Sequence, residues 1–145
     1  MSATMTSQKA SVPMRLKLRR EVARVSDGYY ADAEKLAEWM AREGLKTDQV
    51  RSLENVAYST DKVSDILDLV KRQIGRGQWP VNLGKAMLTA LGKRQAEGEL
   101  VAKAVDASDG DLPRRSHLLL CREYVKHLAA HFIYLHGQRG GEGKA

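Results

Sequence analysis

Residues 60–77 read TDKVSDILDLVKRQIGRG, and this stretch decides the kind of fold that the chain adopts. Its apolar residues recur at steps of three and four, which is the spacing of one buried face of an α-helix. Thr60 can cap the start of this helix, and Gly75 and Gly77 end it. The predicted apolar face consists of Val63, Ile66, Leu67, Val70 and Ile74.

Two further helical patterns lie upstream of this stretch. The first has its apolar stripe between Tyr29 and Met40 and ends at Gly44, and Thr47 is the predicted N-cap of the second. Before them, residues 14–25 could extend as an arm or form a short basic helix. The stripe of the second helix consists of Val50, Leu53, Val56 and Ala57.

Downstream, a helix follows Trp79-Pro80, and the pattern leaves open whether it continues through Gly92 to about residue 105. Residues 106–113, DASDGDLP, have the composition of a loop. The last helix runs from about Arg115 to His136. Its apolar residues follow a regular alternation of three and four, which predicts a seam packed against other helices or a second copy: Leu118, Cys121, Val125, Leu128, Phe132 and Leu135.

These patterns predict an all-α fold, a compact bundle of about five helices. The length of 145 residues suits one domain with one hydrophobic core. We assign residues 14–136 to this single helical-bundle domain. Residues 1–13 are expected to be a disordered N-terminal segment, and residues 137–145 a flexible Gly-rich tail.

The sequence indicates a soluble protein of the reducing cytoplasm. Its one cysteine, Cys121, cannot form an internal disulfide, and the most apolar stretch, Leu118 to Cys121, is far too short to cross a membrane. The basic residues near the N-terminus are not followed by the apolar core of a secretion signal. We therefore expect no membrane association.

Charge is distributed unevenly along the chain. The 24 Lys and Arg residues exceed the 18 Asp and Glu residues by six. Residues 1–27 carry a net charge of +4, residues 28–70 of −4, residues 71–105 of +5 and residues 106–145 of +1. An acidic segment thus lies between two basic blocks, and the basic balance points to a polyanionic partner.

Recognised catalytic motifs are missing from the sequence. It has no GxSxG, HExxH, Walker-type or GxGxxG motif, and its Gly75-Arg76-Gly77 run closes a helix rather than opening one. Cys121 falls within the predicted seam, where a cysteine acts as a small hydrophobic residue. Asp61, Asp65 and Asp68 lie on the polar face of their helix. We therefore predict that the protein is not an enzyme.

The histidines leave one alternative open. His127 and His131 are four residues apart and Glu123 precedes them by the same step, so all three project from one helix face, as in some metal sites. These residues could serve a small metal-dependent enzyme. However, two imidazoles alone rarely hold a structural zinc, and the intervening Leu-Ala-Ala supplies no general base. We favour a structural or partner-facing role, with no metal ion and no other cofactor.

The basic block of residues 71–105 is the strongest functional signal that charge provides. Cations at the end of a helix stabilise it, but seven cations against two anions exceed what capping requires. Trp79 could stack on a base, although packing in the core is the preferred interpretation. The residues that charge nominates for phosphate contact are Lys71, Arg72, Arg76, Lys85, Lys93, Arg94, Arg122 and Lys126.

A resemblance makes this prediction more specific. Residues 29–44 read YYADAEKLAEWMAREG and residues 45–51 read LKTDQVR, and residues 124–136 read YVKHLAAHFIYLH. This order resembles the small all-helical subunit of type III-A (Csm-type) CRISPR effector complexes. That family has a helix leading into a leucine, a Thr/Ser cap, a glutamine, an aliphatic residue and an arginine. The matching residues here are Leu45, Thr47, Gln49, Val50 and Arg51.

The resemblance implies a non-catalytic role in an antiviral ribonucleoprotein. Copies of the family's subunit form a stacked row beside the guide-bearing backbone subunits and the large signalling subunit. They support the duplex of guide RNA and target RNA through cations on its sugar–phosphate backbone, contacts that are independent of sequence and sensitive to salt. Arg51 is the basic residue that matches the family motif, although it could instead pair with Glu54 or Asn55.

The alternative function is a helical protein-interaction adaptor with no nucleic-acid role. Its partner-facing surface would be the acidic segment from Tyr29 to Val70.

Overall fold

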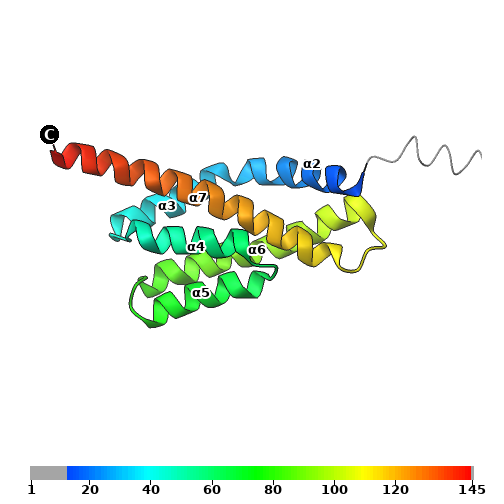
Figure 1. The fold of residues 1–145 in the computed structure, drawn as a ribbon, viewed down its shortest axis with the longest axis horizontal. Helices are drawn as coiled ribbons and strands as arrows, with labels where there is room; N and C mark the ends of the chain where they lie inside the picture. Colours follow the sequence, from blue (N-terminus) through cyan, green and yellow to red (C-terminus); the bar gives the residue numbers. More distant parts are fainter. Residues whose placement is uncertain (1–12, 145) are drawn as a thin grey trace, which may run out of the picture.

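The computed structural model describes the backbone of residues 13–144 and the side chains of residues 13–137 (Figure 1). This part of the chain contains α-helices, one 3₁₀ turn and no strand, which confirms the predicted all-α bundle. Residues 1–12, most of the predicted disordered segment, lie outside the described residues. The elements are α2 (Met14–Ser26), η1 (Asp27–Tyr29), α3 (Tyr30–Arg42), α4 (Thr47–Ser59), α5 (Val63–Gly75), α6 (Val81–Asp106) and α7 (Leu112–Lys144).

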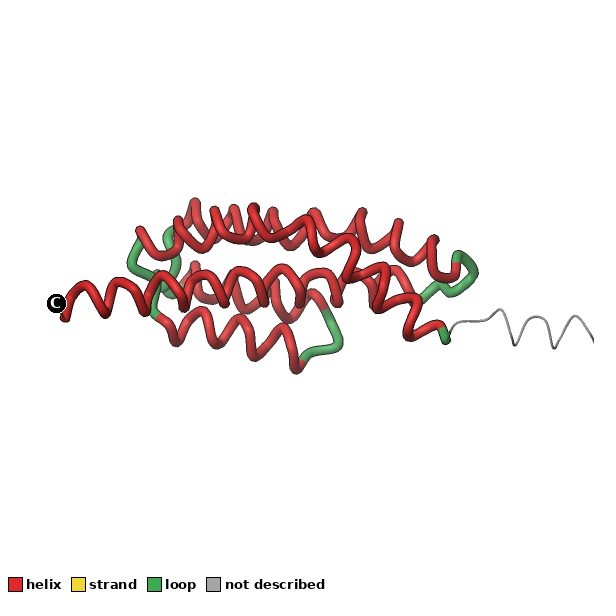
Figure 2. Tube along the Cα trace, turned by 90° about the horizontal axis from the view of Figure 1, so that it is seen from above, coloured by secondary structure: helices red, strands yellow, loops and turns green. Residues whose placement is uncertain are grey.

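The long helix α7 organises the bundle. It runs diagonally across the other helices in Figure 1 and packs against α2, α3, α4, α5 and α6. Figure 2 shows the helices lying roughly along one long axis, with the loop between α4 and α5 near the middle and other loops at the two ends. The predicted seam on α7 is confirmed, since Leu135 is half-buried and the other members are buried: Leu118, Cys121, Val125, Leu128 and Phe132.

Two glycines end helices as the sequence predicts. Gly44 and Gly77 have φ angles of 76° and 74°, in the left-handed region that favours glycine. After each glycine the next N–H bonds to a carbonyl five residues back, from Leu45 to Met40 at 3.1 Å and from Gln78 to Gln73 at 2.9 Å. These are the bonds of the Schellman motif, which satisfies carbonyls at a helix end.

The predicted N-caps at Thr47 and Thr60 are each shifted. Lys46 is the N-cap of α4, and the Gln49 side chain accepts a hydrogen bond from its backbone N–H at 3.0 Å. Lys62 is the N-cap of α5. Thr60 still acts at this helix start, because its hydroxyl accepts the Lys62 N–H at 3.1 Å and donates to the Asp65 carboxylate.

The helix after Pro80 continues without a break through Gly92, which settles the question that the sequence left open. Two other glycines in α6 are required by close packing. A Cβ on Gly98 would lie 2.8 Å from the backbone nitrogen of His117 in α7, and one on Gly84 would lie 2.3 Å from Ile74 Cδ1 in α5. No such neighbour lies near Gly92. The glycines therefore set how closely α6 approaches α5 and α7.

The structure also defines the first and last helices of the described chain. Residues 14–26 form helix α2, so of the two alternatives that the sequence left open, the helix is the one adopted. Helix α7 begins at Leu112, before the predicted start. Pro113 does not prevent this, since proline is tolerated in the first turn of a helix. The backbone of α7 remains helical to Lys144, through the residues expected to form a tail. Within the described part of the chain, no helix combines the length and apolar character needed to span a membrane.

Candidate nucleic-acid interface

Several of the predicted cations gather at one end of the bundle, around the turn that joins α5 to α6. Lys71 and Arg72 lie in the last turns of α5, and Arg76 is its C-cap. Ile74 of α5 packs against Gly84 of α6, which places Lys85 beside this turn. We call Lys71, Arg72, Arg76 and Lys85 the α5–α6 basic end; all four are exposed, and none forms a salt bridge with another described residue.

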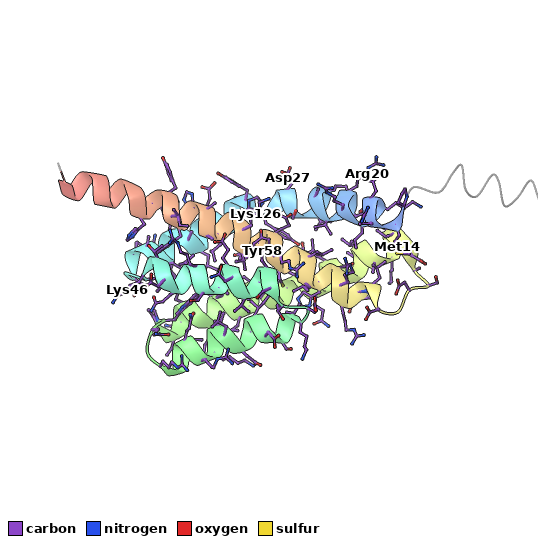
Figure 3. The ribbon with its side chains drawn as sticks, viewed as in Figure 1. Met14, Arg20, Asp27, Lys46, Tyr58 and Lys126 are labelled. Atoms are coloured by element: carbon purple, nitrogen blue, oxygen red, sulfur yellow. The ribbon has the colours of Figure 1, made fainter. Side chains whose placement is uncertain are left out.

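Arg51, the residue that matches the family motif, lies near the start of α4. Figure 3 labels Lys46 just before α4, at the end of the bundle where α5 turns into α6. Arg51 is exposed, and within the described chain it forms no salt bridge, including the predicted alternative with Glu54. Its guanidinium is therefore available to an anion, and the helix that carries it begins at the same end of the bundle as the α5–α6 basic end.

Arg94 does not belong to this surface, and its prediction as an RNA contact is wrong. Its side chain is buried, and its guanidinium lies 4.2 Å from the centre of the Tyr29 ring and 5.2 Å from that of Tyr124. Its Nη1 forms a salt bridge with Glu97 at 3.1 Å, and its Nε donates to the Ala90 carbonyl at 3.0 Å. Arg94 is a core residue that joins α6, η1 and α7.

The same cluster keeps two tyrosines protonated. Tyr29 donates its hydroxyl hydrogen bond to Glu97 at 3.1 Å. Burial raises the pKa of Tyr29 above its ordinary range, and burial raises that of Tyr124 to about 12. The Arg94 charge is thus neutralised by Glu97 and covered by two aromatic faces, which leaves no site for phosphate.

Arg122 is also occupied by the fold. Its Nε donates to the Ala57 carbonyl at 2.7 Å and its terminal nitrogen to the Thr60 carbonyl at 2.8 Å. These carbonyls belong to the end of α4, where a cation stabilises unpaired backbone oxygens. Arg122 is half-buried and acts as a cap supplied by α7, so its prediction as a free RNA contact is corrected.

Lys93 and Lys126 are exposed but lie away from the α5–α6 basic end. Lys93 faces α3 across a shallow groove that Asp32 and Lys35 also line. Lys126 lies on α7, 3.6 Å from the Glu123 carboxylate. The structure therefore divides the nine predicted residues into a cluster with Arg51, two outlying lysines and two arginines that the fold uses internally.

A second basic surface was not predicted. A groove of about 390 Å³ lies between α2 and α7. Its lining includes Arg15, Arg19 and Arg115, together with the capping Arg122 and the carboxylate of Glu123. Tyr58 of α4, 51% exposed, closes one side of it, and Figure 3 shows this residue where α4 passes α7. Its floor is apolar, with contributions from Leu18, Val22 and Leu119.

The sequence indicated the positive charge of this groove but not its position. The net charge of +4 over residues 1–27 marked the segment as basic. The groove exists because Leu18 and Val22 bury their side chains and hold α2 beside α7, which brings Arg115 next to Arg15 and Arg19. An extended polyanion with stacking bases suits a groove of arginines beside an exposed tyrosine.

The other residues that the sequence analysis considered for a chemical role lie in the core or on a polar helix face. Trp79 is 1% exposed, which confirms its packing in the core. Cys121 is fully buried, and burial raises the pKa of its thiol to about 12, so it stays protonated and unreactive at neutral pH. Asp61, Asp65 and Asp68 are exposed on the polar face of α5 and its approach, as predicted.

The three residues of the alternative metal hypothesis do not converge on one point. His127 packs edge-on against the Tyr30 ring at 5.6 Å, and Glu123 pairs with Lys126. His131 faces two carboxylates of α3 instead, Glu34 and Glu38.

Comparison of the chain with protein-family models, curated proteins and solved structures found no match.

Proposed function

We propose that this chain is a non-catalytic small subunit of a type III CRISPR effector complex, which supports the guide–target RNA duplex through its sugar–phosphate backbone. The observation that carries the proposal is the α5–α6 basic end, where Lys71, Arg72, Arg76 and Lys85 are exposed and free of salt bridges. The resemblance of residues 45–51 adds Arg51, on the helix α4 that begins at this end of the bundle.

The geometry suits contacts that ignore base sequence. Lysines act as point charges toward phosphate, and arginine can donate two parallel hydrogen bonds to one phosphate group. Side chains at the end of a rigid bundle can reach the backbone of an A-form duplex without entering its deep major groove. Sequence recognition is then left to base pairing, as in other RNA-guided systems.

The α2–α7 groove offers a second contact for the same ligand. Arg15, Arg19 and Arg115 lie toward the other end of the bundle, where α2 begins. A bundle with cations at both ends fits a row of copies along one duplex, since each copy then meets successive phosphates. The partners in this proposal are guide RNA, target RNA, the other effector subunits and neighbouring copies of this chain.

The test is target-RNA binding by the assembled complex as a function of salt. In the Lys71→Glu/Arg72→Glu/Arg76→Glu variant, we expect weaker binding for every target sequence. The slope of log K against log salt is negative, and each lost phosphate contact lowers its magnitude by about 0.7–0.9, so the triple change should lower the magnitude by about two to three. The control variant Arg20→Glu/Lys103→Glu/Arg114→Glu makes the same change in net charge at exposed sites outside the two basic surfaces.

Two outcomes would overturn the proposal. If the triple variant and its control have equal effects, the α5–α6 basic end makes no specific contact. If the tagged chain purified from its native cells retains proteins but no guide-length RNA, the adaptor function is correct instead.

A further inference from the structure

Two carboxylates and an imidazole meet between α3 and α7, outside both basic surfaces. Glu34 and Glu38 are one turn apart on α3, and His131 projects from the neighbouring α7. The Nε2 atom of His131 lies 3.6 Å from Oε1 of Glu38 and 4.0 Å from Oε2 of Glu34. One potential ligand atom from each of the three residues lies within 4.8 Å of the other two.

This arrangement leaves one buried polar atom unsatisfied and places two carboxylates of like charge beside it. The Nε2 atom of His131 is buried and has no hydrogen-bond partner, whereas nearly all buried polar atoms in proteins have one. Glu34 and Glu38 are like charges at the i and i+4 positions, a spacing that destabilises a helix. Among residues 13–137, no lysine or arginine forms a salt bridge with either carboxylate. A metal cation between the three groups would give the His131 Nε2 atom a partner and reduce the repulsion between the two carboxylates.

We propose that Glu34, Glu38 and His131 bind a divalent transition-metal ion such as Zn²⁺. Imidazole nitrogen together with carboxylate oxygen favours transition metals over Mg²⁺ and Ca²⁺, which prefer oxygen ligands alone. Bonds of about 2.0–2.2 Å to a central ion require ligand atoms about 3–3.5 Å apart. The carboxylates can close the present gaps by side-chain rotation, because they are 31% and 47% exposed, while the helix backbones stay in place.

The structure favours this set over the two histidines on one helix face. His127 directs its ring to Tyr30, and Glu123 is occupied by Lys126. The bound ion would instead connect α3 to α7, two helices far apart in the sequence. Its role is to hold these helices together, and it is independent of the proposed contacts with RNA.

The experiment measures Zn²⁺ binding to the purified full chain after treatment with a chelator. Calorimetry should give one ion per chain, and Co²⁺ should produce the visible absorption of an ordered site. In His131→Ala and in Glu38→Gln, we expect affinity to fall by about 100-fold, since even changes around a ligand cost 10–100-fold. The control His127→Ala removes the neighbouring histidine on the same helix and should leave affinity unchanged.

Zn²⁺ should also raise the thermal midpoint of the wild-type chain and of His127→Ala, but not of the other two variants. Glu38 is half-exposed, so Glu38→Gln keeps the test valid if His131→Ala impairs folding, and circular dichroism checks both. The proposal is wrong if the wild-type chain binds no Zn²⁺, because the three residues then form only an ion pair. It is also wrong if His127→Ala loses as much affinity as His131→Ala.

Discussion

Basic side chains have opposite environments at the α5–α6 basic end and at the contact between α6 and α7. At the basic end, Arg72 and Arg76 extend into solvent from the last turns of α5. Eighteen positions after Arg76, Arg94 lies between aromatic rings with its charge paired to Glu97. Both belong to one basic block of the sequence. Whether a cation contacts a ligand or the core is therefore decided by the helix face on which it falls.

The strongest test of this contrast is the loss of the buried arginine. Arg94→Ala removes two cation–π contacts, a salt bridge and a hydrogen bond, and should lower the free energy of unfolding by about 3 kcal/mol. Lys93→Ala, at the adjacent exposed position, should change it by less than about 0.5 kcal/mol. Urea unfolding of both variants measures the difference, and equal effects would mean that Arg94 is not a core residue.

The close approach of α6 to α7 gives the next largest effect. In Gly98→Ala the new Cβ meets the His117 backbone, and the overpacking should cost about 1–2 kcal/mol after the gain in helix propensity. Gly92→Ala adds a methyl group to the same helix in open space, and should stabilise by up to about 1 kcal/mol. Thermal unfolding compares the two. A stabilising Gly98→Ala would show that the helices separate easily.

A pH dependence follows from the buried thiol between α6 and α7. Burial raises the pKa of Cys121 to about 12 in the folded protein, from an ordinary value near 9 when unfolded. Above pH 9 only the unfolded chain releases this proton, so stability is full below pH 9 and falls as pH rises. The loss between pH 9 and pH 10 should be about 1 kcal/mol. Cys121→Ala should remove that part of the pH dependence, and an unchanged profile would contradict the burial of the thiol.

The smallest effect on stability is expected at the α5–α6 basic end. Arg72→Ala removes a cation from the last turn of α5 and should cost about 0.5 kcal/mol at low salt, through its interaction with the helix dipole. This cost should decrease in 0.5 M salt, because the residue is exposed and its field is screened. A large cost that salt does not change would place Arg72 in the packing of the fold rather than at a binding surface.

Local features of the fold were the most predictable from the sequence. The helix ends at Gly44 and Gly77 depend on nearby residues alone, and both were located correctly. The burial of Arg94 was missed, although a signal was present. Arg94 follows Leu91 by three positions and precedes Val101 by seven, so it shares their helix face. The prediction assigned Arg94 to the surface because of its charge, although its position in the helix places it on the buried face.

The positions of the other corrected residues depend on the tertiary arrangement. Arg122 reaches carbonyls more than sixty positions earlier in the chain, at Ala57 and Thr60. Helix periodicity cannot indicate such a contact. The same is true of His131 and the carboxylates of α3, because their proximity requires that α3 and α7 lie side by side. The α2–α7 groove likewise arises from packing.

The central position of α7 has a consequence for the order in which the protein folds. Helices α2 to α6 precede α7 in the chain, yet each of them packs against it. During synthesis, the apolar faces of the earlier helices are therefore completed only when α7 leaves the ribosome. Contacts between residues far apart in the sequence slow folding. Until α7 is available, helices α2 to α6 expose apolar surface. Truncation within the buried part of α7 should consequently yield aggregation-prone chains.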